Sequence, residues 1–177
     1  MVSDLLTLAR VENDEEAIEL TEVSPIPALN EAIGFCQTSL DEKKCEIDIK
    51  IPEKAILRAN SFLLTQVFRN LLENACRYSQ EYGVITITGE TAGNFMQFTV
   101  ADTGEGIPAQ YLKRVFERFY QVDKVRSKTS SGLGLSICKH IVERHGGRIW
   151  AESPFQGKGT AIMFTIPLLN NPTSGKT

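Results

Sequence analysis

A chain of 177 residues, 42% of them hydrophobic and 23% charged, is long enough to bury one core and predicts one domain with at most a short appendage. Its net charge of -3 excludes the basic footprint typical of nucleic-acid binding, and no apolar run predicts a membrane span or a signal peptide. The four cysteines form no C-x-x-C pair, which favours reduced thiols in a cytoplasmic protein over zinc ligands or disulfides.

The first half of the chain predicts a helix end, a complete helix and short strands. The apolar pattern of residues 2–11 indicates the tail of a helix, which the acidic residues 12–16 interrupt, so we expect a piece of a longer protein. A helix is expected to start at Ser24-Pro25, because proline is tolerated in the first turn, and to continue to Leu40. Strands are expected at residues 18–23, 45–51 and 56–59.

The second half predicts two amphipathic helices among further strands. Apolar residues recur every three or four positions over Ser61–Ser79, the clearest helix. The last helix begins near Leu133 and is expected to end at His145-Gly146-Gly147, in the manner of a glycine cap. Expected besides these are strands at 84–88, 95–100, 148–151 and 160–166, a hairpin turn at Gly93-Asn94, a long loop with a short helix at 108–131 and a frayed tail at 170–177. Helices mixed with antiparallel-type strands predict an α+β fold, a two-layer sandwich with the helices on one face of the sheet.

An acidic residue is expected to point into the core at the end of one strand. Apolar and polar residues alternate over 95–100, and Asp102 continues the inward-facing series. A carboxylate in the core is costly unless a charged or hydrogen-bonding group meets it. Gly104 and Gly106 allow a tight turn and the close approach of a ligand. We therefore expect Asp102 in a pocket for a donor group, such as the exocyclic amine of adenine.

Polar residues are stacked along one face of the helix Ser61–Ser79. Asn70, Asn74 and Arg77 lie at i, i+4 and i+7. Asparagine oxygens can complete a Mg²⁺ shell of water and phosphate oxygens, and an arginine can bind phosphate. The spacing alone favours an ordinary solvated face, although two asparagines are poor choices within a helix.

Two glycine-containing segments suit contacts with a phosphate or a base. Gly132–Leu135 lies where a loop becomes the last helix, and helix N-termini bind anions. Thr160, which ends the run Gly157–Thr160, shares the parity of the apolar residues after it, so its hydroxyl is expected to face inward as Asp102 does. The ordinary alternatives are a flexible helix start and a glycine turn whose threonine bonds locally to backbone.

The segment Lys113–Lys128 is basic and carries Phe116 and Phe119. It is typical of a mobile lid over phosphates, of a partner-docking surface, or of both. His140 and His145 lack partners at metal-ligand spacing, which favours surface or capping roles over catalysis.

The order of these motifs resembles the catalytic, ATP-binding domain of bacterial sensor histidine kinases, of the GHKL type. The match covers about residues 20–168, and five motifs in the same order are specific although each alone is weak or moderate. The five segments are Asn70–Ala75, Asp102–Ile107, Phe116–Phe119, Gly132–Leu135 and Gly157–Thr160. The resemblance implies a mixed, mostly antiparallel sheet of about five strands packed against three helices, with a mobile ATP lid.

The resemblance also implies ATP and Mg²⁺ as cofactors. Asn74 would hold Mg²⁺, with Asn70 as a second candidate ligand, and Asp102 would read the adenine. Residues expected to bind the nucleotide are Asn70, Asn74, Arg77, Tyr78, Asp102, Gly104, Gly106, Ile107, Phe119, Gly132, Leu133, Gly134, Leu135 and Thr160. The candidate catalytic residues are Asn70, Glu73 and Asn74.

Three parts are expected on the same grounds. Residues 1–16 would be the end of a dimerisation helix and a linker, residues 17–169 the catalytic domain and residues 170–177 a disordered tail. No phosphoacceptor histidine motif is present, so the substrate would be the histidine-bearing dimerisation domain of the same kinase, with a response regulator receiver domain as the next partner. The parent protein would be a cytoplasmic homodimer, with or without a membrane anchor, and this domain would contact neither nucleic acid nor membrane.

Three rival functions differ in what they need. Related ATPases carry a glutamate at the place of Asn70, and an amide cannot activate water in that way, so transfer to a protein is favoured, with Glu73 nearby as a base or acceptor. A serine-directed anti-sigma kinase would lack the helix before residue 12. A nucleotide-binding module without catalysis stays open, because Thr129-Ser130-Ser131 replace the glycines that often precede Gly132 in the family.

Overall fold

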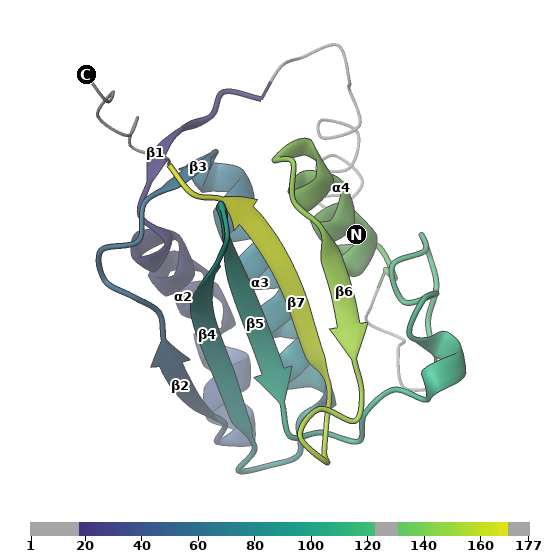
Figure 1. Ribbon diagram of the computed structural model, residues 1–177. Helices are drawn as coiled ribbons and strands as arrows, with labels where there is room; N and C mark the ends of the chain where they lie inside the picture. Colours follow the sequence, from purple (N-terminus) through teal and green to yellow (C-terminus); the bar gives the residue numbers. More distant parts are fainter. Residues whose placement is uncertain (1–17, 123–130, 170–177) are drawn as a thin grey trace, which may run out of the picture.

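Figure 1 shows the computed structural model, which describes residues 18–122 and 131–169. The predicted helix end at 2–11, part of the predicted lid and the predicted tail at 170–177 lie outside the described residues. No helix in the described ranges is long and apolar enough to cross a membrane.

The main sheet has five strands in the order β2-β4-β5-β7-β6 (Figure 1). The strands β2 (Glu46–Lys50) and β4 (Val84–Ala92) are parallel. All other neighbours in this sheet are antiparallel, namely β4 with β5 (Phe95–Asp102), β5 with β7 (Ala161–Pro167) and β7 with β6 (Ile149–Glu152). A separate antiparallel pair is formed by β1 (Thr21–Val23) and β3 (Leu57–Ala59).

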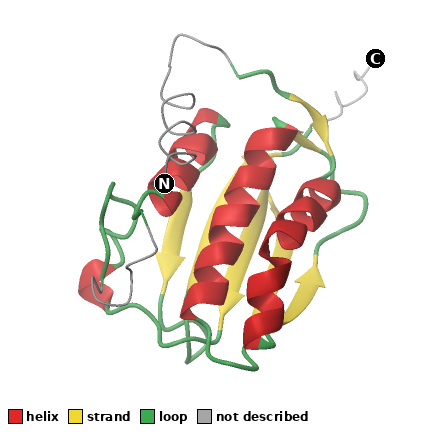
Figure 2. Cartoon of the chain, turned by 180° about the vertical axis from the view of Figure 1, so that it is seen from behind, coloured by secondary structure: helices red, strands yellow, loops and turns green. Residues whose placement is uncertain are grey.

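Three helices cover one face of the main sheet, as the view from behind in Figure 2 shows. They are α2 (Pro25–Lys43), α3 (Ser61–Tyr78) and α4 (Gly134–Arg144), and α3 contacts both of the others. The described part of the loop after β5 contains a short 3-10 helix, η1 (Ala109–Tyr111). The expected two-layer α+β sandwich with a mostly antiparallel sheet is confirmed.

An aromatic cluster joins the helix layer to the sheet. Phe68 of α3 meets Phe98 of β5 edge-on, with ring centroids 5.3 Å apart, and Phe164 of β7 at 5.6 Å. The two sheet rings stack on each other at 5.1 Å, and all three side chains are fully buried. Edge-on and offset pairs of this kind add to the area that the rings bury. The core therefore fixes α3 directly over β5 and β7.

The last helix ends as its glycines predict. Gly146 follows α4 with a φ of +78°, and the N–H of Gly147 donates to the Val142 carbonyl at 3.0 Å. Of the surface and capping roles expected for His145, the capping role is confirmed, because His145 is the C-cap residue of α4 and only 3% of it is exposed. Its Nε2 accepts the N–H of Asn60 at 3.0 Å, so the end of α4 is tied to the residue that caps α3.

Several predicted strands differ from the structure in their bounds, and β1 begins at Thr21 rather than at residue 18. The strand β4 continues beyond Thr88 to Ala92, because its pairing with β5 persists through Gly89 opposite Phe98 and on to the hairpin at Gly93. The polar residues of that extension hide it from a hydrophobic pattern. Thr160 lies just before β7 rather than within it.

Candidate functional site

One cavity of about 410 Å³ lies beside α3, the end of β5 and the start of α4. Asn74 on α3 and Asp102 on β5 both line it, although 28 positions separate them in the chain. The predicted site residues in its lining are Asn70, Glu73, Asn74, Arg77, Tyr78, Asp102, Gly106, Ile107, Gly132, Gly134, Leu135 and Thr160.

Three predicted residues lie outside this lining. Leu133 is 1% exposed, and its apolar side chain belongs to the hydrophobic core rather than to the cavity wall. The Phe119 residue is 65% exposed. Its backbone N–H donates a hydrogen bond of 3.0 Å to the carbonyl of Gly132, which lines the cavity. Gly104 packs against the end of α3, where a Cβ would overlap the carbonyl oxygen of Tyr78. Its role is close contact between the loop after β5 and the end of α3.

The Asp102 carboxylate is buried, as the strand parity predicted. Its Oδ1 accepts hydrogen bonds from the backbone N–H groups of Gly104 at 2.8 Å and of Thr160 at 3.4 Å. Burial raises the pKa of Asp102 above its ordinary value, while these two N–H groups act in the opposite direction. Oδ2 makes no hydrogen bond within the described residues, so this oxygen is the acceptor left for a donor group in the cavity.

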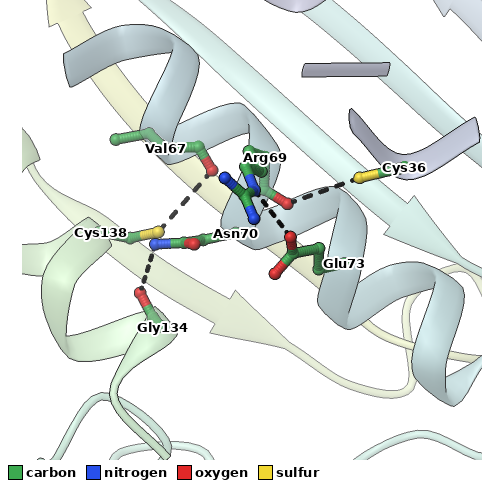
Figure 3. Close-up of polar contacts among 7 residues, drawn as sticks. All are labelled: Cys36, Val67, Arg69, Asn70, Glu73, Gly134 and Cys138. Atoms are coloured by element: carbon green, nitrogen blue, oxygen red, sulfur yellow. Dashed lines mark hydrogen bonds and ion pairs between the residues drawn. The ribbon is translucent and has the colours of Figure 1, made fainter. Parts of the chain in front are cut away.

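Two separate polar contacts involve residues of α3 that line the cavity (Figure 3). Asn70 is buried, and its Nδ2 donates to the Gly134 carbonyl at 3.3 Å, which joins α3 to the first turn of α4. Glu73 forms an ion pair of 2.8 Å with Arg69 one turn earlier. Because both residues are about 40% exposed in their side chains, this pair orients Glu73 more than it stabilises the fold.

The start of α4 suits an anion. Its first backbone N–H groups have no partner within the helix, and its dipole is positive at this end. Gly134 lines the cavity here, and a Cβ added to it would meet only Asn70, at 3.8 Å. Among the described residues, therefore, nothing in the local contacts requires a glycine, and its bare backbone is open to a ligand.

The sequence patterns missed several cavity residues. They are Arg69, Leu71, Ala75, Val100, Glu105, Val115, Tyr120, Gln121, Val122, Ser131 and Ile162. Arg69 was detectable, because it lies at i, i+4 and i+8 with Glu73 and Arg77. Val115 and Tyr120 belong to the predicted lid, but their inward position depends on how the loop folds.

Metal binding would need more than protein side chains. The described residues contain no group of three or more His, Cys, Asp or Glu that could hold a metal ion. Asn70 and Asn74 offer amide oxygens on the same cavity wall, which fits Mg²⁺ whose remaining ligands are water and phosphate.

A family model described as histidine kinase-, DNA gyrase B- and HSP90-like ATPase matches residues 59–170, more than half of the chain. The chain belongs to this family. The matched region begins just before α3 and contains the whole cavity lining.

Histidine kinases are the named relatives within this ATPase family. The chain is 33% identical over 172 residues to sensor histidine kinase WalK of Bacillus subtilis, covering 94% of this chain and 28% of that protein. It is 36% identical over 172 residues to sensor protein kinase WalK of Staphylococcus aureus, covering 94% and 41%. The chain thus spans less than half the length of these relatives.

Solved histidine kinases have the same fold. The catalytic domain of ThkA superposes with a TM-score of 0.75 at 28% identity, covering 85% of this chain and 96% of that one. Full-length ShkA in complex with AMPPNP gives 0.81 at 27% identity, covering 94% and 35%. ThkA in complex with the response regulator protein TrrA gives 0.74 at 27% identity, covering 94% and 48%. The ATPase-family sandwich of this chain is therefore that of a histidine kinase catalytic domain.

Proposed function

We propose that this chain is the catalytic domain of a two-component sensor kinase, which binds Mg·ATP and transfers its γ-phosphoryl group to a histidine of the dimerisation domain. The observation that carries the proposal is the position of Asn74 and Asp102 in the lining of one cavity. The names of the WalK relatives and the AMPPNP complex of ShkA support it. The domain would span residues 17–169.

The base would bind at the Asp102 end of the cavity. The free Oδ2 of Asp102 accepts a hydrogen bond from the exocyclic amine of adenine. Gly104, Gly106 and Ile107 form the loop beneath the base. Tyr78 and Thr160 complete this end. A carboxylate acceptor discriminates against a keto group, because a buried acceptor facing an acceptor stays unpaired.

The phosphates would lie between α3 and the start of α4. Asn74 contributes its amide oxygen to Mg²⁺, with Asn70 as the second candidate, and Arg77 provides a cation for phosphate oxygens. The backbone of Gly132–Leu135 and the positive end of α4 complete the anion site. Bound Mg²⁺ supplies charge neutralisation at the phosphates. The chain's own residues mainly position the reactants, which is the larger part of catalysis in phosphoryl transfer.

Transfer to a protein is favoured over hydrolysis by the residues at positions 70 and 73. The amide of Asn70 cannot remove a proton from water, and its Nδ2 is bonded to Gly134. Glu73 is paired with Arg69, and this contact occupies one of the two carboxylate oxygens of Glu73. A neutral imidazole is already nucleophilic and needs no strong base, so these residues suit histidine as the phosphate acceptor.

The partners follow from this role. We propose the histidine-bearing dimerisation domain as substrate and a response regulator receiver domain as the subsequent acceptor, within a cytoplasmic homodimer of the full-length kinase. The solved complex of ThkA with TrrA supports the regulator.

Phosphorylation in trans tests the proposal. The chain is mixed with a separately produced histidine-bearing dimerisation domain and γ-labelled ATP, and we expect label on that domain only when both proteins and Mg²⁺ are present. Asn74→Ala should lower the initial rate at least about 100-fold, because Mg²⁺ loses a ligand. Asn94→Ala, an exposed asparagine of the β4–β5 turn, is the matched control and should keep the full rate. Equal rates for the two variants would exclude the metal role of Asn74, and absence of any label with the unaltered chain would exclude the kinase function.

A further inference from the structure

The hydroxyl of Ser153 connects two loops that contribute residues to the cavity lining. Ser153 follows β6, and its Oγ accepts the N–H of Ile107 at 2.7 Å. The same Oγ donates to the Gly159 carbonyl at 3.0 Å, and it accepts a longer bond of 3.5 Å from the Thr160 hydroxyl. A serine hydroxyl has one proton and two lone pairs, so these three bonds use its full capacity. Neither the motifs nor the cavity lining include Ser153.

Both loops that Ser153 joins hold the Asp102 carboxylate. The loop after β5 supplies the Gly104 N–H to Asp102 Oδ1, and the Gly159–Thr160 turn supplies the Thr160 N–H to the same oxygen. The backbone of Asp102 is also bonded to Thr160, whose carbonyl accepts its N–H at 2.9 Å. A displacement of either loop would therefore move or rotate the carboxylate.

The contacts around this hydroxyl are close. A Cβ on Gly106 would lie 2.8 Å from Ser153 Oγ, and a Cβ on Gly159 would overlap the Asp102 carbonyl. Backbone atoms thus approach each other without intervening side chains, and the Ser153 hydroxyl bonds across the junction together with Asp102 Oδ1. Because Gly106, Ile107 and Thr160 line the cavity whereas Ser153 does not, Ser153 acts on the site through these neighbours.

Thr160 adds a second acceptor at this end of the cavity. Its Oγ1 lies 3.5 Å from Ser153 Oγ, longer than a usual O–H···O bond, and its lone pairs can accept from a ligand. The free Oδ2 of Asp102 is likewise an acceptor. This end of the cavity therefore offers side-chain acceptors, which match an amino group on the base and oppose a keto oxygen.

We propose that Ser153 is a positioning residue for nucleobase selection, which holds the Ile107 loop and the Thr160 turn so that Asp102 meets the exocyclic amine. This inference rests on the proposed binding of ATP. Ser153, which lies outside the cavity lining, would affect the selectivity for the exocyclic amine. It would not affect the binding of the phosphates.

A pair of nucleotides that differ only in the exocyclic amine separates positioning from general support of the fold. The dissociation constants of ATP and of purine riboside triphosphate, which lacks that amine, are measured by calorimetry for the 177-residue chain and for Ser153→Ala. The unaltered chain should prefer ATP, and Ser153→Ala should reduce this preference about five- to tenfold, the worth of roughly one hydrogen bond. Affinity for purine riboside triphosphate should change less than twofold. Ser153→Thr, which keeps the hydroxyl, should restore the preference, and Ser61→Ala, at an exposed serine, should leave it unchanged.

Amide exchange gives a second readout that needs no nucleotide. In Ser153→Ala the Ile107 amide should exchange faster, because it loses its acceptor, while the Ile87 amide in the core of β4 should not change. An unchanged ATP preference in Ser153→Ala, or equal loss of affinity for both nucleotides, would overturn the positioning role even if the melting temperature fell. If the unaltered chain bound neither nucleotide, the proposed function would fail and this inference with it.

Discussion

Replacing Lys43 by methionine should loosen the end of α3 that forms one wall of the cavity. Lys43 is the last residue of α2, and its Nζ donates to the carbonyls of Cys76, Arg77 and Ser79 at 2.7, 2.6 and 2.8 Å. The final carbonyls of a helix have no partner within it, and a cation there also interacts favourably with the negative end of the helix dipole. Methionine keeps the apolar stem of lysine but removes the ammonium group.

The three bonds set the size of the effect. A hydrogen bond to a charged group contributes about 1.5–3 kcal/mol. The three bonds share one donor, and Lys43 is only half-buried, so water can replace part of what is lost and the contributions do not add. We expect a loss of about 2–3 kcal/mol in the free energy of unfolding, because that is one to two such bonds after solvent compensation. For a chain of this length it corresponds to a melting temperature lower by roughly 4–12 °C.

Urea and thermal unfolding, followed by the fluorescence of the single tryptophan, Trp150, measure this loss. Lys44→Met is the matched control, because Lys44 is exposed and, within residues 18–122 and 131–169, its Nζ bonds to the Tyr82 hydroxyl and lies over the Tyr82 ring, contacts worth less than about 1 kcal/mol. If Lys43→Met and Lys44→Met melted within about 1 °C of each other, the three-carbonyl contact would have no energetic weight. Since Arg77 and Tyr78 line the cavity, Lys43→Met should also weaken nucleotide binding.

Two further perturbations test contacts that hold the fold around the site. Burial lowers the pKa of His145 from its ordinary 6.5, and Arg144 adds to this while the Ile141 carbonyl opposes it. Below about pH 6.5, therefore, His145 binds a proton in the unfolded chain but not in the folded chain. The free energy of unfolding is highest above that pH and falls as the pH decreases. Urea midpoints at pH 7.5 and 5.5 should show a smaller decrease in His145→Gln, and equal decreases would contradict this reasoning. Gly159→Ala should destabilise by more than about 4 kcal/mol, because its Cβ would overlap the Asp102 carbonyl. Gly157→Ala, with a φ of +90° but no atom near its Cβ, should cost only about 1–2 kcal/mol, and similar melting temperatures for both alanine variants would rule out the overlap.

Local patterns were sufficient for the elements and for the direction of key side chains. The three-and-four spacing of apolar residues located α3 to within one residue, and strand parity placed Asp102 on the buried face. Both depend on the geometry of a single element, which sequence spacing fixes directly. The position of Asn74 on the cavity wall follows in the same way once the apolar stripe of α3 faces the sheet.

Contacts between distant segments could not be predicted in this way. Lys43 reaches carbonyls 33–36 positions along the chain, and His145 accepts an N–H from a residue 85 positions away. Such pairs depend on how α2, α3 and α4 are arranged on the sheet. The spacing of residues along the sequence does not predict this arrangement. Ser153 is a clear case, because a lone serine after a strand has no pattern that distinguishes it from a solvated turn residue.

The glycines show why a motif identifies positions without stating their physical role. At Gly104 and Gly159 a Cβ would overlap a backbone carbonyl, so these residues are required by the folded chain whether or not a ligand binds. At Gly134 a Cβ would find ordinary contact distances, and no steric conflict among the described residues explains the glycine. Gly104 and Gly159 bring loops together around the Asp102 carboxylate, while Gly134 leaves the start of α4 uncovered toward the cavity. The same residue type therefore builds the base-binding end in one case and keeps the proposed phosphate end accessible in the other, and only the three-dimensional contacts separate the two.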